Sequence, residues 1–390
     1  MPIKSLFLTL SLLLSLNSFA DYTDLEDKQC GKEVMFELKK LIKIDPERYI
    51  TETNNYEFPS KMGPYNVEVF IEECHEDLAW FADAFKVLDD QGNIIFERDN
   101  YSSNLQEVVP EADFPFYILR DYSGGMHCCY TTYYFSKSKP YSYMGTLNSR
   151  DVKPSYEDID GDGNAELIEY DANLTYWYTS FAGSRFIKVI YRAFGDEFHP
   201  APDLILQDMD YQDVETALEQ MRDVIKGHDD WAEEQKEWAK YKDDQILHDI
   251  GAFTAQFLYA GMEEEAWEFY DQIWAEQEFG FFRKMSFKRE LEAQIMKSDQ
   301  YKSIHARSAV MDNLPKITSL SKECVYMREE GWGKDEDSEA RFTDINLREL
   351  HNDECGGDPE TDVTIGYYRV YEDGKVEEFD YLDWQLRNLE

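Results

Sequence analysis

Hydrophobic and polar residues follow two different periods along this chain, and the change of period divides it. From residue 21 to residue 206, after an expected opening helix over 32–44, short runs rich in β-branched and aromatic residues are separated by turn residues, which is typical of strands. Over 207–314 glycine and proline become rare and apolar residues recur at helical spacing. After Pro315 the strand pattern returns. The pattern predicts a multidomain α+β chain.

The strand and helix segments can be placed individually. The expected strands are 66–71, 93–97, 116–120, 130–135, 166–171, 174–179, 186–192, 340–350, 364–371 and 376–382. A helical stripe over 214–225 and a further helix over 281–297 are expected in the central part. We therefore predict a mostly-β domain over 21–206, helical hairpins over 207–314 and a small β-rich domain over 315–390.

One stretch of the helical part has the pattern of a known repeat. Thr254, Phe257, Gly261, Ala266 and Tyr270 are spaced like the signature positions of one tetratricopeptide helical hairpin, with the glycine at the turn. The resemblance implies a peptide-binding groove. The pattern occurs only once, however, and such repeats need about three copies to stack, so ordinary helical packing is the other interpretation.

Residues 158–169 read D-I-D-G-D-G-N-A-E-L-I-E and space oxygen ligands as a calcium ion requires. The expected ligands are the side chains of Asp158, Asp160, Asp162 and Glu166 together with the backbone carbonyl of Asn164. The segment upstream is too short and too rich in proline for the entering helix of an EF-hand, and the segment downstream reads as a strand. The other interpretation is an acidic turn that holds no ion.

This loop-to-strand arrangement resembles the calcium loops of FG-GAP and VCBS-type repeats, in which the ninth position is the last ligand. The resemblance implies that Glu166 coordinates, that Glu169 does not, and that the Ca²⁺ is structural. Because the loop occurs once, we expect a blade-like sheet or a sandwich instead of a closed propeller. Together with the G-G-x-H-C-C run that begins at Gly124, the loop resembles a family of uncharacterised exported bacterial proteins over residues 110–200. That resemblance implies an exported, calcium-dependent module and names no activity.

The first twenty residues indicate export. Lys4, an apolar run over 6–16 and a small-x-small ending at Ala20 are typical of a secretory signal peptide. We expect a periplasmic protein, with secretion as the alternative. No later segment reaches 18 uninterrupted apolar residues, so no membrane insertion is expected.

The net charge of the chain limits the kinds of molecule that it is expected to bind. The chain carries a formal net charge of −42, which argues against nucleic acid because phosphate binding relies on clustered Lys and Arg. Basic proteins or peptides and metal ions are the natural complements. Acidity that serves solubility alone is the alternative explanation.

Six cysteines in an exported chain predict disulfides. Cys324 and Cys355 are expected to form one local bridge. The other four are Cys30, Cys74, Cys128 and Cys129, and two separate bridges are preferred to a vicinal ring because neighbouring strand residues face opposite sides. Alternatively, Cys74-His75 and His127-Cys128-Cys129 supply ligands for a soft metal or a thiol-redox site.

Sequence motifs of common enzymes are absent: the chain has no G-x-S-x-G elbow, no H-E-x-x-H and no phosphate-cradling glycine loop. His351 is a lone candidate whose ordinary role is to hydrogen-bond a loop carbonyl. The sequence therefore predicts an exported, calcium-stabilised protein that binds protein or peptide without catalysis. A narrower form of this prediction is an inhibitor or immunity protein for a basic toxin or hydrolase. The alternative is an envelope hydrolase that acts on glycan or peptide.

Overall fold

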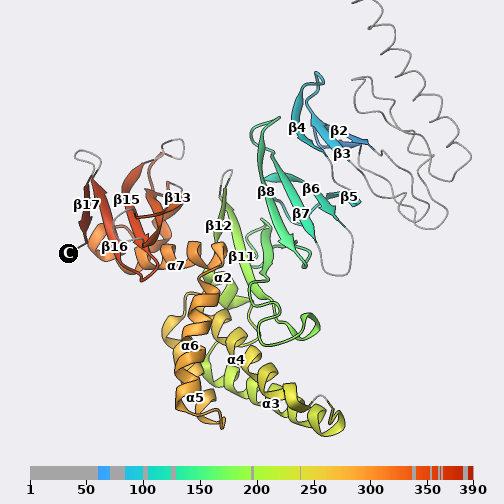
Figure 1. Cartoon of the computed structure of the whole chain (residues 1–390). Coiled ribbons are helices and arrows are strands. Elements are labelled where there is room, and N and C mark those ends of the chain that lie inside the picture. Colours follow the sequence, from blue (N-terminus) through green and yellow to red (C-terminus); the bar gives the residue numbers. More distant parts are fainter. Residues whose placement is uncertain are drawn as a thin grey trace, which may run out of the picture. The chain divides into compact units, whose positions relative to one another are not determined.

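The computed structural model describes residues 60–70, 84–99, 104–123, 129–194, 197–237, 239–335, 340–351, 354–358, 361, 363–380 and 385–389. The expected signal peptide and the opening helix over 32–44 lie outside the described residues. The chain divides into two compact units, residues 1–153 and residues 154–390, and each is described by itself (Figure 1). Among the described residues there are four antiparallel sheets and seven α-helices, which confirms a mixed chain.

The first unit contains two four-stranded sheets, each in sequential strand order. Their strands are β1 (Lys61–Met62), β2 (Tyr65–Phe70), β3 (Ala84–Leu88), β4 (Ile94–Arg98), β5 (Asn104–Val108), β6 (Phe116–Tyr122), β7 (Tyr130–Ser136) and β8 (Tyr143–Arg150). Aromatic rings from both sheets share one core, with ring centroids 5.3 Å apart for Tyr65 and Phe135 and 5.1 Å apart for Phe85 and Tyr133. Burying such large side chains supplies much of the apolar area that holds the two sheets together.

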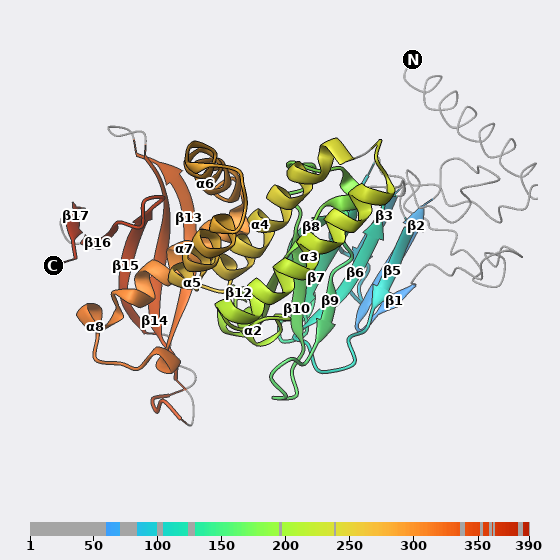
Figure 2. The same cartoon turned by 90° about the horizontal axis from the view of Figure 1, so that it is seen from below.

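The second unit begins with a four-stranded sheet in the order β12-β11-β10-β9, followed by helices. The strands are β9 (Ser155–Glu157), β10 (Glu166–Asp171), β11 (Ile187–Phe194) and β12 (Glu197–Pro200), and the helices are α2 (Pro202–Gln207), α3 (Val214–Glu234), α4 (Lys242–Tyr259), α5 (Glu263–Ala275) and α6 (Phe281–Ile295). Helix α4 packs against β11 and is buried along most of its length, as the position of α4 between the other helices in Figure 2 illustrates.

The sheet and the helices of this region are built around a single core. Ile168, Val189 and Ile190 of the sheet are buried in the same cluster as Phe257 and Phe269 of the helices. The boundary expected at residues 206 and 207 therefore falls inside a continuous apolar cluster. The division into domains remains a prediction.

Helix ends follow the local chemistry of the sequence. Asp213 caps α3 by accepting a hydrogen bond from the backbone N–H of Thr216 at 2.8 Å. Gly261, with φ of 74°, turns the chain between α4 and α5, a left-handed conformation that favours glycine. The helical hairpin expected around this glycine is confirmed.

The end of the chain forms a five-stranded antiparallel sheet in sequential order. It comprises β13 (Val325–Lys334), β14 (Arg341–Glu349), β15 (Thr364–Tyr371), β16 (Val376–Asp380) and β17 (Gln385–Asn388), preceded by α7 (Asp299–Asp312) and α8 (Leu314–Ile317). Helix α7 contacts β14 and β15, and Ile345, Leu347 and Val370 share a core with Val310 of α7.

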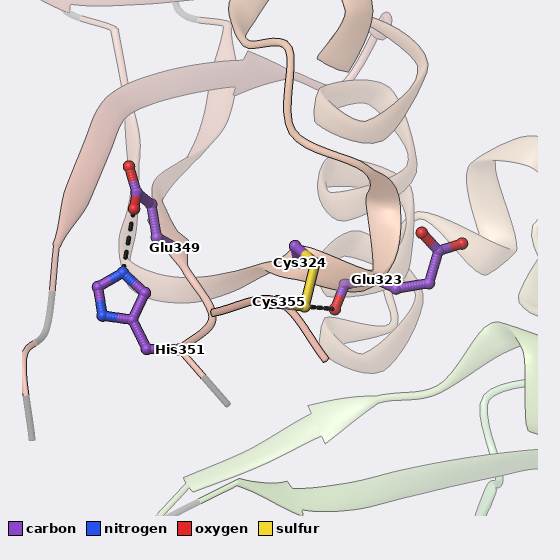
Figure 3. Close-up of a disulfide and its surroundings, with 5 residues drawn as sticks. All are labelled: Glu323, Cys324, Glu349, His351 and Cys355. Atoms are coloured by element: carbon purple, nitrogen blue, oxygen red, sulfur yellow. Dashed lines mark hydrogen bonds and ion pairs between the residues drawn. A yellow bond between two sulfur atoms is a disulfide. The ribbon is translucent and has the colours of Figure 1, made fainter. Parts of the chain in front are cut away.

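The predicted disulfide of this region is confirmed. Cys324 and Cys355 are joined with an S–S distance of 2.05 Å, as Figure 3 shows. The bridge connects the turn before β13 to the loop after β14, which closes a chain segment of 31 residues in sequence separation. Among the described residues, no helix combines the length and the apolar character needed to cross a membrane.

Candidate functional site

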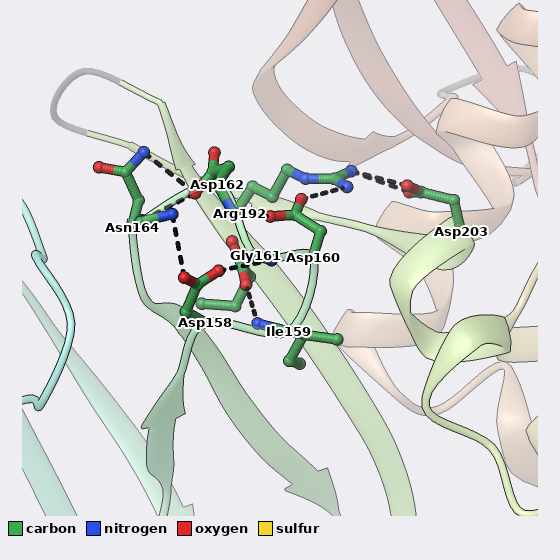
Figure 4. A network of polar contacts seen from close by, with 10 residues as sticks. Asp158, Ile159, Asp160, Gly161, Asp162, Asn164, Arg192 and Asp203 are labelled. Atoms are coloured by element: carbon green, nitrogen blue, oxygen red, sulfur yellow. Dashed lines mark hydrogen bonds and ion pairs between the residues drawn. The ribbon is translucent and has the colours of Figure 1, made fainter.

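The predicted calcium loop connects β9 to β10, so strands flank it on both sides. Side-chain oxygens of Asp158, Asp160 and Glu166 all lie within 4.8 Å of one another. Gly161 and Gly163 have φ of 78° and 95°, which lets the backbone reverse within a few residues. The loop thus brings three of the five expected ligand residues together, and Figure 4 labels two of them, Asp158 and Asp160.

Backbone N–H groups hold these carboxylates in place. Asp158 accepts hydrogen bonds from the backbone of Gly161 at 2.7 Å and of Gly163 at 2.9 Å, while buried Glu166 accepts one from Ile159 at 2.9 Å. Asp160 forms an ion pair with Arg192, whose Nη2 lies 3.0 Å from Asp160 Oδ2. The backbone therefore fixes the acidic side chains before any cation is considered.

The remaining expected ligands lie at the rim. Asp162 accepts from both the backbone and the side-chain nitrogens of Asn164, at 2.7 Å and 3.1 Å, and does not join the converging trio. Burial, reinforced by the charges of Asp160 and Asp162, raises the pKa of Glu166. An all-oxygen set with this much uncompensated negative charge fits a hard divalent cation. Glu169 lies within β10, outside the converging group.

A second feature was not anticipated from the sequence. A cavity of about 1060 Å³ opens between the segment after β10 and helices α3 and α4, and we call it the cleft. Four aromatic side chains line it, namely Tyr176, Tyr178, Trp231 and Tyr241. Tyr176 is 62% exposed and Trp231 is 39% exposed, so apolar ring surface faces solvent inside a concavity. Such pockets are typical ligand sites.

One segment of the cleft wall differs from the secondary structure predicted for it. Residues 174–179 were expected to form a strand, and they form turns in which Tyr176 and Tyr178 both have φ of 62°. This left-handed conformation is costly for residues other than glycine and persists only where surrounding structure enforces it. Trp177 between them provides that enforcement, because its ring stacks on Phe287 at 5.1 Å. Tertiary packing therefore overrides the strand tendency of this aromatic run.

Two kinds of contact fix the wall to α4. A Cβ atom added at Gly251 would lie 2.5 Å from the Trp177 ring, so only glycine admits the ring this close to the helix. His248 bonds through Nδ1 to the carbonyl of Trp177 at 2.8 Å and accepts at Nε2 from the backbone N–H of Arg185 at 2.8 Å. The two bonds require the neutral tautomer with the proton on Nδ1. Burial accordingly lowers the pKa of His248.

Three hydrogen-bonded side chains, those of Arg185, His228 and Asp249, line the cleft. Asp249, which is buried, accepts from Arg185 Nε through one oxygen and lies 2.6 Å from His228 Nε2 through the other. Burial alone would raise the pKa of Asp249, but the hydrogen bond from His228 and the charge of Arg185 outweigh burial and lower it. The carboxylate is thus compensated within the protein and orients two side chains that border the cleft.

Sequence reasoning missed these residues because they are scattered. His228 lies on α3, Asp249 on α4, and Arg185 just before β11, and the bonded partners are separated by 21 and 64 positions in the sequence. One signal was present. The adjacent His248-Asp249 pair interrupts an apolar helical run, and a polar pair at buried positions must find partners.

The other candidates proposed from the sequence lie elsewhere. Cys129 is disulfide-bonded, and Cys30, Cys74 and Cys128 lie outside the described residues, as do both histidines of the soft-metal alternative. His351 bonds to Glu349 at 3.0 Å (Figure 3), and it also bonds to the carbonyl of Asp358 at 3.1 Å. Its contacts are those of a loop-anchoring histidine.

The cleft offers binding groups and lacks an assembled nucleophile. The hydroxyl of Thr179 donates to Gln245 and that of Ser184 donates to the carbonyl of Ser180, and in the described part of the cleft no Ser or Thr hydroxyl bonds to a histidine. Compared with known proteins, the chain matches no family model, no curated protein and no solved structure. The chemistry of the site's own residues therefore carries the functional inference.

Proposed function

We propose that this chain is an exported, calcium-stabilised protein that binds a protein or peptide segment in the cleft without chemically changing it. The observation that supports this proposal most directly is the structure of the cleft. It is a large concavity with exposed aromatic rings and a wall held by hydrogen bonds to His248, and among its described residues no Ser or Thr hydroxyl bonds to a histidine. Aromatic side chains provide large contact area at low entropic cost, which suits them to peptide recognition.

The predicted calcium loop, which lies before β10, also supports this proposal. Asp158, Asp160, Asp162, Asn164 and Glu166 would hold the ion, which would supply the positive charge that the converging carboxylates require. The loop ends where β10 begins at Glu166, and the first residue that lines the cleft, Tyr176, follows the end of β10 at Asp171 by five positions. A cation in the loop would therefore stabilise the strand that carries the wall. This FG-GAP- and VCBS-like staple is structural in our proposal.

The proposed compartment is the periplasm, with secretion as the alternative. Residues 1–20 have the pattern of a signal peptide, and the Cys324–Cys355 bridge suits an oxidising environment. Calcium is abundant outside the cytoplasm, so even a site with a dissociation constant on the order of 10⁻⁴ M would be filled there.

Charge favours a basic partner. The net charge of −42 attracts cationic proteins or peptides and accelerates their association, as an inhibitor or immunity protein for a basic toxin or hydrolase would require. A catalytic alternative rests on one contact. The His228–Asp249 pair is the arrangement of an oriented general base, and with a water molecule as nucleophile it would make the protein a hydrolase of glycan or peptide.

One experiment separates binding from hydrolysis. A pool of synthetic hexapeptides with basic residues is dialysed to equilibrium against the full chain in calcium, and retained peptides are identified by mass spectrometry. We expect retention of intact peptides, and loss of retention in Trp231→Ala, whose ring lines the cleft. The matched control is Trp332→Ala, a 79% exposed ring on β13 outside the cleft, which should change nothing. Peptides recovered as fragments would support hydrolysis, and retention of no peptide at all would contradict the proposal.

A further inference from the structure

One side chain of the cleft has hydrogen-bonding capacity that the protein does not use. Arg185 donates from Nε to Asp249, and its guanidinium carbon lies 5.2 Å from the centre of the Phe253 ring. Its Nη1 and Nη2 make no hydrogen bond to any residue in the described ranges. The side chain is 43% exposed and borders both the cleft and an adjoining hollow of about 190 Å³.

Contacts within the protein fix the orientation of the Arg185 guanidinium in the absence of a ligand. The Nε edge of the guanidinium is fixed by Asp249, which is itself held by His228, and the backbone N–H of Arg185 is fixed by His248. The opposite edge presents Nη1 and Nη2 as two parallel donors. A carboxylate accepts from this edge through both oxygens, and that geometry is the one arginine recognises best.

We propose that the cleft binds the free C-terminal carboxylate of a peptide, with Arg185 Nη1 and Nη2 as its donors and the terminal residues packed against Tyr176 and Trp231. The inference rests on the proposed peptide-binding function and names the end of the peptide that is recognised. Binding energy comes from two charge-assisted hydrogen bonds in a partly desolvated concavity together with apolar contact on the exposed rings.

The acidic residues around the cleft favour the C-terminal carboxylate of a peptide over the carboxylates of a polyanionic glycan. Asp244 lines the cleft, and Asp229, Asp230 and Asp243 lie on the same two helices. A chain of uronic acids would place several carboxylates against these acids. A peptide brings a single terminal carboxylate to Arg185, and its basic side chains can face the acidic residues.

The test compares two peptide pools that differ only at the terminus. Hexapeptides with a free C-terminal acid and the same sequences with a C-terminal amide are dialysed against the full chain in calcium, and the best-retained sequence is titrated calorimetrically in both forms. We expect the acid form to bind about tenfold or more tightly than the amide, because amidation removes the charged acceptor. Trigalacturonic acid serves as the polyanionic glycan probe and is expected not to bind.

A conservative variant separates recognition from stability. Arg185→Lys keeps a cation beside Asp249 but removes the two-donor edge, so the preference for acid over amide should fall to within about twofold while thermal unfolding shows an intact fold. Arg222→Lys is the matched control, because Arg222 is bonded to Glu276 outside the cleft, and its preference should equal that of the wild type.

The outcomes distinguish the two proposals. Equal affinity of wild type for acid and amide, or an unchanged preference in Arg185→Lys, overturns carboxylate recognition and leaves peptide binding in place. Retention of neither pool overturns peptide binding itself. Binding of trigalacturonic acid in place of the peptides overturns the assignment of the ligand.

Discussion

The calcium loop and the cleft lie at the two ends of β10 and are built in opposite ways. All the expected ligand residues of the loop fall within nine positions, from Asp158 to Glu166, and short backbone hydrogen bonds hold the side chains of Asp158 and Glu166. The cleft combines Arg185, His228 and Asp249 from three separate segments. The loop is a product of local spacing, whereas the cleft exists only because helices pack against the segment after the strand.

The two regions also differ in how negative charge is compensated. Asp158, Asp160 and Glu166 gather three carboxylates with a single guanidinium, that of Arg192, at the edge of the group. Asp249 has a partner from the protein on each of its oxygens. The calcium ion that we propose for the loop would supply the missing positive charge, whereas Asp249 already has its partners within the protein. The stability of the loop should depend on calcium, and the stability of the cleft on packing.

The largest expected effect comes from disturbing the packing of the cleft wall. Gly251→Ala would place a Cβ 2.5 Å from the Trp177 ring, which is already stacked on Phe287 and cannot retreat without moving the wall. We expect the free energy of unfolding to fall by about 3 kcal/mol, measured by urea denaturation in calcium.

The control for this variant is a glycine in the neighbouring helix. Gly227 lies inside α3, and apart from its chain neighbours and the nearby backbone of the helix itself no atom would lie within 4 Å of an added Cβ. Gly227→Ala should stabilise the protein by about 0.5 kcal/mol, because alanine is the better helix former. Similar results for the two variants would show that the Trp177 contact does not support the wall.

Removal of calcium should have the next largest effect. With calcium in the millimolar range and a dissociation constant near 10⁻⁴ M, chelation should lower the free energy of unfolding by about 2 kcal/mol, because the ion binds only the folded state. Glu166→Gln keeps an acceptor for the Ile159 N–H and removes one charged ligand, so its melting temperature should respond much less to calcium. Identical melting of the wild type with calcium and with chelator would refute the calcium site.

Charge neutralisation at the base of the cleft should cost less. Asp249→Asn weakens the charge-assisted bonds to Arg185 and His228, and we expect a loss of about 1.5 kcal/mol that does not depend on calcium. Asp229→Asn is the matched control, because Asp229 pairs with Lys242 across the same two helices at the exposed surface, and it should cost less than about 0.5 kcal/mol. Equal losses would indicate that burial of Asp249 carries no energetic weight.

The smallest effect should appear as a dependence on pH. Because burial holds the pKa of His248 below 6.5, the unfolded chain binds a proton there that the folded chain does not, and stability falls as the pH drops below 6.5. His199 and His305 are partly buried, this burial lowers the pKa of each, and both act in the same direction. The depressed pKa of Asp249 matters only below its usual 3.8, outside this window.

The contribution of His248 can be isolated by comparison with one variant. Between pH 6.5 and 5.5 the wild type should lose up to about 1 kcal/mol for each buried histidine, and His248→Gln should show a shallower slope. The measurement is urea unfolding at fixed calcium across this pH range. A variant slope equal to that of the wild type would contradict a neutral, buried His248.

Much of the secondary structure was predictable because the relevant signals are local. The strand expected over 364–371 matches β15, the helix expected over 281–297 matches α6 to within two residues, and Gly261 ends α4 as expected. The failure over 174–179 has a definite cause. Alternating aromatic residues favour a strand, but the partly buried ring of Trp177 packs against α4 and α6, and that contact is invisible in the sequence.

The sequence alone determined the features that depend on neighbours in the chain: the change from strand to helical spacing, the acidic loop from Asp158 to Glu166, and the pairing of Cys324 with Cys355. These features could be read because short spacing dictates which atoms meet. Only the tertiary structure decided the cleft, the tautomer of His248 and the free edge of Arg185. Each requires a close approach between residues tens of positions apart, and such contacts arise from the packing of a shared core that no local pattern specifies.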